Sequence, residues 1–339
     1  MTDLDFYPEY IKPSQWKLWD EFVKESPQGT IFQTFSYIQC VTEAFQRPAK
    51  ILSVWGRNRI VGGVVLYPLK RWGLSYATTP YFIPYNGFLL HHFNESSFYY
   101  RRTYLQNKAL AMLMNEIGKT FAFVDLHQSP SLEDMRELIW KKWQFTPEYT
   151  VLVHLQRGED LLQFVERDQR RRIRNFESQN IKFQPITEME ALYQLMEKSY
   201  FRHRIHPPLP RELFLTFTKD LLERQLAACH GIFRNDELLS AVLTVEDFPT
   251  VYALFSGKTD TDDASSAELY LFWKIIQYYR GKSFQTIDFL GAMVPSIAKI
   301  KMELGGVLQR SDRTVNYRNK LIETFAGINN RIKAKQRQI

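Results

Sequence analysis

Two segments near the C-terminal end of the chain, IDFLG (287–291) and IAKIKMELGG (297–306), decide the fold prediction. The first predicts a short strand that closes a helix-plus-strand unit and ends at a glycine. The second predicts a short helix, because its apolar residues have helical spacing and two glycines follow them. A strand, a gap and a glycine-terminated helix in this order are specific enough to compare with known families.

Working outward, two predicted hairpins have similar sequences, RNRIVGGVVL (57–66) and RNDELLSAVL (234–243). Both begin with the dipeptide Arg-Asn at the turn, and an apolar run follows in the same register. Helices are predicted before the hairpin in each half, at 14–23 and up to Phe45, and at 161–179, 189–201 and 211–225. We therefore interpret the chain as one unit that occurs twice, although two unrelated hairpins could also match over so short a stretch.

The length of 339 residues also favours two domains. We expect an α/β protein in which each half is a mixed sheet flanked by helices. The first domain is placed at 1–149, and the second, with most of the active cleft, at 150–311. Beyond Asp312 the strand pattern stops, so a basic helix or tail, packed back on the first domain, is expected over 312–339.

The composition is that of a folded protein with a preference for anionic partners. Apolar residues make up 45% and charged residues 24% of the chain, which excludes disorder over most of it. The net charge of +7 favours a carboxylate, a phosphate or a lipid headgroup as partner. Aromatic residues reach 15%, more than packing requires, so some of them are expected on a surface that recognises a ligand.

Other functional classes lose support because their signatures are missing. Cys40 and Cys229 have no spacing that suggests a zinc site or a disulfide framework, which favours a reducing compartment. No secretory signal is visible, and the longest apolar stretch, 60–66, predicts a buried strand, so a cytoplasmic protein is expected. Hydrolase triads, Walker loops and dinucleotide fingerprints are also missing, which argues against hydrolases, NTPases and dehydrogenases.

The segments 287–291 and 297–306 resemble the signature of the FemAB-like peptidoglycan bridge-forming acyltransferases. The resemblance rests on Asp288, Phe289, Gly291, Lys301 and the glycine pair 305–306, while Ile300 and Leu304 replace aromatic positions. It implies two tandem GNAT-like domains, like those of acyl-CoA N-acyltransferases, and transfer of an acyl group to an amine. Characterised members of the family move an aminoacyl group from aminoacyl-tRNA to a cell-wall precursor, whereas relatives of this kind are presumed to use acyl-CoA.

The resemblance further implies a catalytic role for Lys301, which matches the family lysine assigned to stabilise the oxyanion. Attack of an amine on an ester or thioester develops negative charge on the carbonyl oxygen, and an ammonium or a backbone N–H can stabilise it. The alternative is an ordinary lysine on a helix surface. Lys299 is the nearest residue that could be mistaken for it.

Two segments are candidates for binding the acyl donor. Ordinary GNAT proteins hold the CoA pyrophosphate at a glycine-rich helix start, but the equivalent segment here, 262–268, has two leading aspartates and no glycine. Ser265 and Ser266 could donate to phosphate or serve only as a helix cap. Arg171 and Arg174 belong to a run of five arginines that could contact tRNA phosphates or a diphosphate. The run could equally be a solvated helix face that pairs with Glu166, Asp168 and Glu177.

The acceptor is assigned to a loop and a strand of the second half. Tyr200, His203 and Arg204 precede a proline turn, where Arg204 could hold a carboxylate or phosphate and His203 or His206 could accept the amine proton. No further ligand completes a metal set with the two histidines, so no metal is expected. Tyr252 and Ser256 lie on a strand that faces the reaction in GNAT-like folds, or they only pack in the core.

The sequence therefore predicts an N-acyltransferase whose donor is aminoacyl-tRNA or acyl-CoA and whose acceptor is an amine, of a small molecule or a lipid-linked cell-wall precursor. One alternative is an acetyl-CoA-dependent acetyltransferase of a sugar amine or polyamine. Another is a binding module that kept the fold but lost the donor site. Possible partners are tRNA and, through the basic C-terminal segment, an anionic membrane surface. The oligomeric state is left open.

Overall fold

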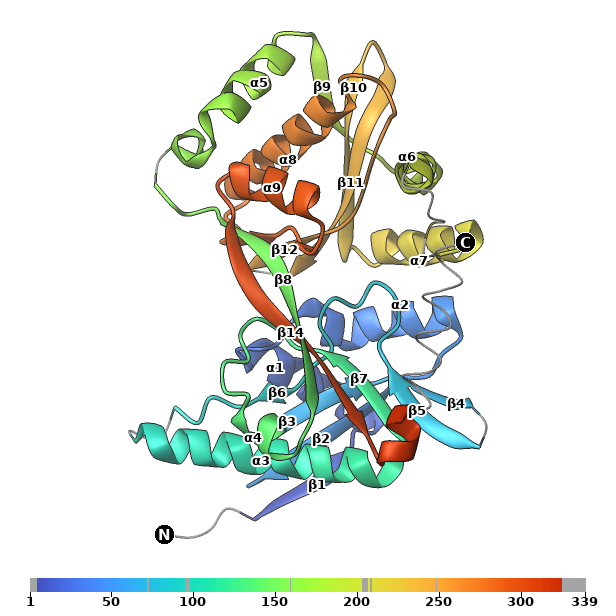
Figure 1. The fold of residues 1–339 in the computed structure, drawn as a ribbon, viewed down its shortest axis with the longest axis vertical. Coiled ribbons are helices and arrows are strands. Elements are labelled where there is room, and N and C mark those ends of the chain that lie inside the picture. Colours follow the sequence, from blue (N-terminus) through green and yellow to red (C-terminus); the bar gives the residue numbers. More distant parts are fainter. Residues whose placement is uncertain are drawn as a thin grey trace. The chain divides into compact units, whose positions relative to one another are not determined.

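The computed structural model describes residues 5–324, apart from 72, 95–97, 159, 203–206, 208 and 248. The chain divides into two compact units, which are drawn in Figure 1. The first contains the residues up to Thr42, Gln46–Pro147 and the residues from Ser311 onward. The second contains Glu43–Phe45 and Glu148–Arg310. The boundaries at 147/148 and 310/311 both fall inside strands, Gln144–His154 and Val307–Tyr317, so no loop separates the units there.

The first unit packs its longest helix against an antiparallel sheet of strand order β1-β2-β3-β6. The strands are β1 (Phe6–Tyr10), β2 (Lys50–Gly56), β3 (Arg59–Leu66) and β6 (Leu89–Leu90). A second group of strands contains β4 (Pro68–Arg71), β5 (Leu74–Thr78), β7 (Phe123–His127) and the end of β14 (Val307–Tyr317). The helices are α1 (Trp16–Glu25), α2 (Phe35–Phe45), α3 (Tyr99–Thr120) and α4 (Arg136–Trp140). α3 packs on the sheet because Leu105, Ala109 and Leu113 recur every four residues on its buried face.

The second unit is a six-stranded sheet covered by helices on both faces, with α5 and α8 on one side and α6 and α7 on the other (Figure 1). The strand order is β8 (Gln144–His154), β13 (Thr286–Asp288), β12 (Thr250–Lys258), β11 (Glu237–Asp247), β10 (Ala227–Arg234) and β9 (Ile181–Pro185). The helices are α5 (Arg167–Glu177), α6 (Met189–Arg202), α7 (Arg211–Glu223), α8 (Ala264–Gly281) and α9 (Pro295–Glu303). α8 contributes more buried residues to the core of this unit than any other element, ten in all.

Both units contain a parallel strand pair joined by a long helix. In the second unit β12 leads through α8 to β13, and Tyr252 pairs in parallel register with Asp288. In the first unit β5 and β7 are parallel, with α3 between them in the chain. An antiparallel hairpin precedes each crossover, β2–β3 in one unit and β10–β11 in the other. The mixed α/β class and the repeated order of elements agree with the sequence prediction, and the stretch 60–66 is the buried strand expected of it.

The two hairpins are equivalent with a shift of one residue from the predicted register. In the first, Arg57 and Asn58 have positive φ and the closing pair is Gly56 and Arg59. In the second, positive φ falls on Asn235 and Asp236, and Arg234 pairs with Glu237. The dipeptide Arg-Asn therefore does not occupy the same turn positions. The second turn places Asn235 and Asp236, which tolerate left-handed backbone, where the first turn has Arg57 and Asn58.

The strand pattern does not stop at Asp312, as the sequence predicted. β14 continues to Tyr317, where Arg313–Tyr317 pair with β7. The strand was missed because polar residues fill its buried positions: Asp312 and Thr314 are both buried. The Gln128 side chain donates to the Thr314 hydroxyl at 2.8 Å, so this burial is compensated. The basic residues 325–339 lie outside the described chain.

Gly257 is the residue that lets α6 lie against β12. A Cβ atom at this position would come within 2.6 Å of the Leu195 carbonyl carbon and the Met196 amide nitrogen, which are backbone atoms of α6. We expect Gly257→Ala to lower the free energy of unfolding by about 1–3 kcal/mol, because the helix must move away from the strand. Urea unfolding measures this. Gly118→Ala is the control, since its Cβ would meet nothing within 4 Å; an equal loss in both variants would contradict the expectation.

Candidate active site

Lys301 lies inside the second unit and not on a helix surface. It belongs to the last turn of α9, and the residue is 7% exposed. Its Nζ donates to three backbone carbonyls of the loop after β13, those of Phe289 at 2.8 Å, Leu290 at 2.7 Å and Gly291 at 3.0 Å. An ammonium has three protons, so each proton already has an acceptor. A direct bond to a developing oxyanion would require one of these bonds to break.

The loop after β13 is shaped so that its carbonyls converge on this ammonium. Leu290 and Gly291 both have positive φ, at 52° and 34°. Asp288 holds the turn from inside, because its Oδ1 accepts the Leu290 N–H at 2.8 Å and the Thr150 hydroxyl. Asp288 is itself 2% exposed. In the motif that suggested the family resemblance, Asp288 and Lys301 therefore both stabilise the turn by hydrogen bonds to its backbone.

The charge of Lys301 is balanced by carboxylates on two other elements. Burial lowers the pKa of Lys301 to about 8, and the carboxylates of Asp288 and Glu268 act against this shift. Glu268 lies in the second turn of α8 and accepts a hydrogen bond from Lys258 Nζ at 2.5 Å. The lysine is thus linked electrostatically to β13 and to the start of α8. At neutral pH the ammonium form prevails, since its pKa remains above 7.

One backbone donor of the loop is free. The Leu290 N–H bonds to Asp288, and the Ala292 N–H donates to the Tyr149 carbonyl at 2.8 Å. Within the described part of the chain, the Gly291 N–H between them has no hydrogen-bond partner, and Gly291 is exposed. This N–H belongs to the same peptide unit as the Leu290 carbonyl that Lys301 binds. A cation on the carbonyl oxygen polarises the peptide, which makes its N–H a stronger donor.

The acceptor residues predicted from the sequence are only partly placed. Tyr252 is buried on β12, and burial raises its pKa, with Asp247 and Asp288 raising it further. Its neighbour in register is Asp288, so it belongs to the surroundings of Lys301. Ser256 is half-buried further along β12, and Tyr200 is half-buried on α6, where burial raises its pKa. His203, Arg204 and His206 lie outside the described residues.

At the start of α8, the predicted donor site, most hydrogen-bond donors already have acceptors within the chain. The N–H groups of Ser266 and Ala267 both bond to the Asp263 carbonyl, at 2.8 and 3.0 Å. Ser265 is exposed, and Ser266 accepts a hydrogen bond from Arg172 Nη2 at 3.2 Å. The Asp263 carboxylate pairs with Arg234. A pyrophosphate would find few free donors here and a carboxylate close by, so the turn does not fit the CoA phosphates well.

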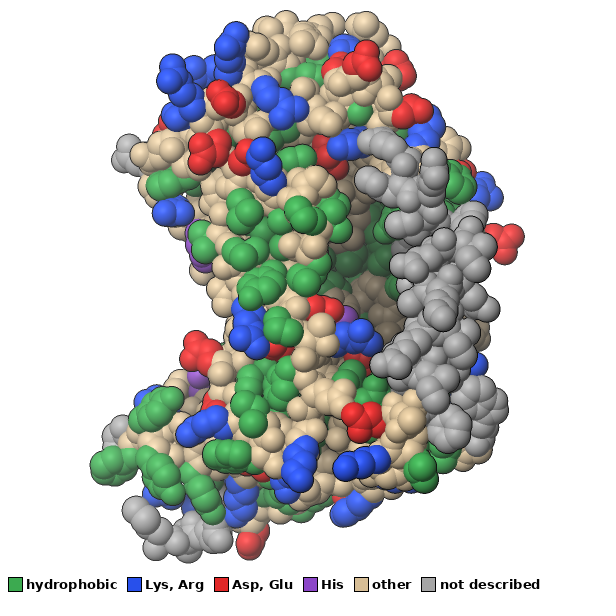
Figure 2. Space-filling model, viewed as in Figure 1, with side chains coloured by type: hydrophobic (Ala, Val, Ile, Leu, Met, Phe, Trp, Pro, Cys, Tyr) green, Lys and Arg blue, Asp and Glu red, His purple; other side chains and the backbone are tan. Residues whose placement is uncertain are grey.

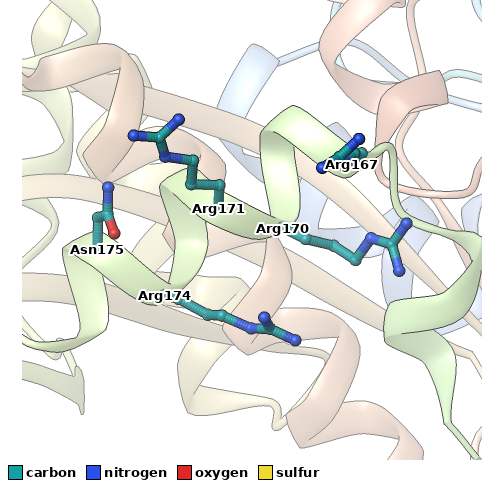
Figure 3. A pocket seen from close by; sticks show the side chains of 5 residues that line it. All are labelled: Arg167, Arg170, Arg171, Arg174 and Asn175. Atoms are coloured by element: carbon teal, nitrogen blue, oxygen red, sulfur yellow. The ribbon is translucent and has the colours of Figure 1, made fainter.

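Four arginines and one asparagine of α5 line a pocket of about 350 Å³: Arg167, Arg170, Arg171, Arg174 and Asn175. In Figure 3 Arg170 and Arg174 extend to the same side of the helix, whereas Arg171 points to the other. None of the four makes an ion pair within the described residues, so the alternative that they pair with Glu166, Asp168 and Glu177 is not observed there. The arginines therefore present unpaired positive charge.

α5 lies beside the first turn of α8. Arg172 reaches Ser266, and four residues later Phe176 packs on Tyr270 with ring centroids 5.5 Å apart. At its other end, α5 contacts α9, because Gln169 donates to the Glu303 carboxylate at 2.8 Å. The arginine pocket, the start of α8 and the helix of Lys301 are thus neighbours within one unit.

Sequence reasoning missed the roles of two residues of this site, Thr150 and Glu268. Thr150 lies 138 residues from Asp288, and Glu268 acts on Lys301 from another helix, so no local pattern marks either contact. Gly291 was noted as part of the motif, and its free N–H depends on a backbone conformation that the sequence alone does not reveal. Among the described residues, no group of His, Cys, Asp and Glu could hold a metal ion. No helix in the same part of the chain has the length and apolar character needed to cross a membrane.

Comparison with known proteins defines the class. Residues 164–295 match the family model of the acetyltransferase (GNAT) domain. None of the curated proteins matches the chain in sequence. The structure of FemX is similar with a TM-score of 0.68 at 14% identity, covering 90% of this chain and 96% of that one.

Two further solved structures have the same fold. The C-terminal domain of a putative lysylphosphatidylglycerol synthetase from Agrobacterium fabrum has a TM-score of 0.54 at 9% identity, with 94% and 96% of the two chains covered. A tandem GNAT protein from the clavulanic acid biosynthesis pathway has a TM-score of 0.53 at 10% identity, with 94% and 99% covered. The predicted FemAB-like double GNAT fold is confirmed, and residues 164–295 carry the GNAT domain of an acyltransferase.

Proposed function

We propose that the protein transfers an aminoacyl group from aminoacyl-tRNA to an amine of a cell-wall peptidoglycan precursor. In this reaction the amine nitrogen attacks the ester carbonyl, a C–N bond forms, and the C–O bond to the tRNA ribose breaks. The amine proton leaves with the ribose oxygen. The reaction class follows from the GNAT domain.

The observation that carries the choice of donor is the arginine pocket of α5. Arginines at positions 167, 170, 171 and 174 are neighbours on one helix, and like charges at this spacing destabilise it. Arg167 also begins the helix, where the helix dipole disfavours positive charge. The cluster therefore costs stability, and a polyanion would remove that cost. Phosphates of an RNA backbone match several guanidinium groups at once.

The start of α8 supports the same choice. The N–H groups of Ser266 and Ala267 are bonded to Asp263, and the carboxylates of Asp262 and Asp263 would repel a pyrophosphate. An anionic donor is therefore held better by α5, next to that turn, than by the turn itself. Arg172, which bonds to Ser266, connects the two helices at this place.

For the chemical step, we assign the oxyanion to the Gly291 N–H and a positioning role to Lys301. The ammonium holds the carbonyls of Phe289, Leu290 and Gly291, and so fixes the direction of the free N–H. It also polarises the Leu290–Gly291 peptide, which makes the Gly291 N–H a stronger donor to a negatively charged oxygen. Preorganised donors of this kind are worth about 10²–10³ in rate when one is removed.

The acceptor assignment rests on the sequence. Arg204 would hold a carboxylate or phosphate of the precursor, and His203, Tyr200, Tyr252 and Ser256 are assigned to the same substrate; these roles stay predictions. The cytoplasmic location stays a prediction as well. So does membrane contact through the basic C-terminal segment, which lies outside the described residues from 325 onward.

The donor is tested by thermal unfolding of the full chain with deacylated tRNA and, separately, with acetyl-CoA. A ligand at a hundredfold excess over its dissociation constant adds about 2.7 kcal/mol to stability. We expect such stabilisation from tRNA and none from acetyl-CoA. The reverse result would overturn the tRNA assignment.

The second candidate, an acetyl-CoA-dependent acetyltransferase of a sugar amine or polyamine, is favoured by one observation. The family model that matches residues 164–295 is an acetyltransferase domain, and the match includes α5 and the start of α8. In this case the arginines would bind the phosphates of CoA. Stabilisation by acetyl-CoA alone would select this candidate, and turnover with either donor would exclude a non-catalytic binding module.

A further inference from the structure

A cluster of aromatic side chains at the start of α3 is exposed and serves no role in the core. Phe98 is 67%, Tyr99 74% and Tyr100 79% exposed, and Tyr104 follows one turn later. Trp140, at the end of α4, is 61% exposed. We call these five residues the aromatic tip. Figure 2 shows hydrophobic side chains gathered over this end of α3, with Lys and Arg side chains beside them.

Contacts between α3 and α4 hold the tip together. The rings of Tyr100 and Tyr104 stack with centroids 6.3 Å apart. Asn107 of α3 donates to Asp134, just before α4, at 3.3 Å. Arg136 pairs with the same Asp134 at 2.7 Å, so Asp134 connects the start of α4 with α3.

Cations accompany the exposed rings. The Arg102 guanidinium lies 5.9 Å from the centroid of the Tyr99 ring, and that of Arg136 lies 5.7 Å from Trp140. Arg101 follows in the same turn of α3, and Lys141 and Lys142 follow Trp140 in the chain. The acids near it in the described part of the chain are Glu133, Asp134 and Glu137, and Glu95 precedes Phe98 in the sequence. Five cations against four acids leave the tip and its surroundings with a net positive charge.

The geometry of the rings indicates what covers them. Successive residues of a helix point about 100° apart, so Tyr99 and Tyr100 face different sides of α3, and Phe98 precedes the helix with an extended backbone. A groove on a protein would contact one side of the helix, with anchors spaced three or four residues apart. Tyr100 and Tyr104 have that spacing, but a groove that covered them would leave Tyr99 and Phe98 exposed. Rings on several sides of a helix end can all be buried at once in the headgroup region of a lipid bilayer. Tyr and Trp also prefer the boundary between water and lipid.

We infer that the aromatic tip docks the protein on an anionic lipid bilayer. The rings enter the headgroup region of the membrane, and Arg101, Arg102 and Arg136 meet the lipid phosphates. Rings and cations together supply the two signals that stable but reversible membrane attachment requires. The inference rests on residues 98–104 and 136–142 of the first unit and is independent of the donor and of the acceptor.

The test is co-sedimentation of the full chain with vesicles of phosphatidylcholine alone and of phosphatidylcholine mixed with phosphatidylglycerol. We expect binding to the mixed vesicles, with weaker binding when salt is raised. The triple variant F98S/Y99S/Y100S is expected to bind at least about tenfold more weakly. The matched control is Y7S/Y81S, since Tyr7 and Tyr81 of the same unit are 50% and 58% exposed. This control should bind like the unmodified protein.

The expectation fails if the unmodified chain binds neither vesicle, or if the triple variant and the control bind equally. The tip could instead be covered by a second copy of the chain, and light scattering distinguishes such a dimer from a monomer. A dimer that the triple variant abolishes, without vesicle binding, would show that the tip is a self-association surface and overturn the inference. Circular dichroism checks that the triple variant is folded. If it is not, Arg101→Gln takes its place, and it should weaken binding to the anionic vesicles only.

Discussion

Replacing Lys301 with Met is expected to lower turnover by at least about tenfold while the protein stays folded. Methionine keeps the apolar stem but has no proton for the three carbonyls at 2.7–3.0 Å. The Leu290–Gly291 peptide then loses the cation that polarises it, and the direction of the Gly291 N–H is no longer fixed. Stability should fall by about 3–5 kcal/mol, because three carbonyls lose their donor and the buried carboxylate of Asp288 loses its nearby cation. Steady-state kinetics and urea unfolding measure the two effects.

Lys299→Met is the matched control for this prediction. Lys299 lies two residues earlier on α9, its side chain is 72% exposed, and its Nζ is 3.7 Å from the Glu303 carboxylate. Turnover of this variant should equal that of the unmodified protein. Full activity of Lys301→Met would remove Lys301 from the mechanism. Loss of cooperative folding together with activity would make Lys301 a structural residue only.

The elements that the sequence predicted best are those whose signals are local. The hairpin turns were found because their residues tolerate positive φ, and the strand 60–66 because its residues are apolar without interruption. β14 was missed beyond Asp312 because its buried positions hold an aspartate and a threonine, whose partners lie on distant elements. The one-residue shift between the hairpins shows that matching residue types alone does not establish register.

The site could be predicted only in part for a related reason. The motif led to Lys301, but the acceptors of its protons are backbone carbonyls, which have no signature in a sequence. Sequence left open whether the arginines of α5 pair with acids of their own helix, and the structure shows no such pairs among the described residues. That α5 lies beside the start of α8 follows from Arg172 and Ser266, 94 residues apart in the chain. Tertiary packing, not local pattern, brings them together.

The double variant R171Q/R174Q is expected to bind tRNA about ten- to a hundredfold more weakly at low salt, because both arginines line the pocket of α5. Each contact with a phosphate releases about 0.7–0.9 counterions, so the slope of log affinity against log salt should fall by about 1–2. The change in slope identifies lost phosphate contacts, whereas a general loss of fold would not alter it in this manner. Fluorescence anisotropy with labelled tRNA over a range of salt concentrations measures both quantities.

The control for charge is K182Q/K219Q, which removes two positive charges from β9 and α7 of the same unit. Both lysines are exposed and pair with acids, Lys182 with Asp236 at 2.8 Å and Lys219 with Glu223 at 3.6 Å. If tRNA responded only to net charge, both double variants would lose affinity equally and the pocket would not be the site. Thermal stability provides a second criterion. Removing two of four adjacent arginines relieves repulsion along α5, so R171Q/R174Q should be at least as stable as the unmodified protein. A protein that is equally stable but binds tRNA weakly has lost a binding surface and not its fold.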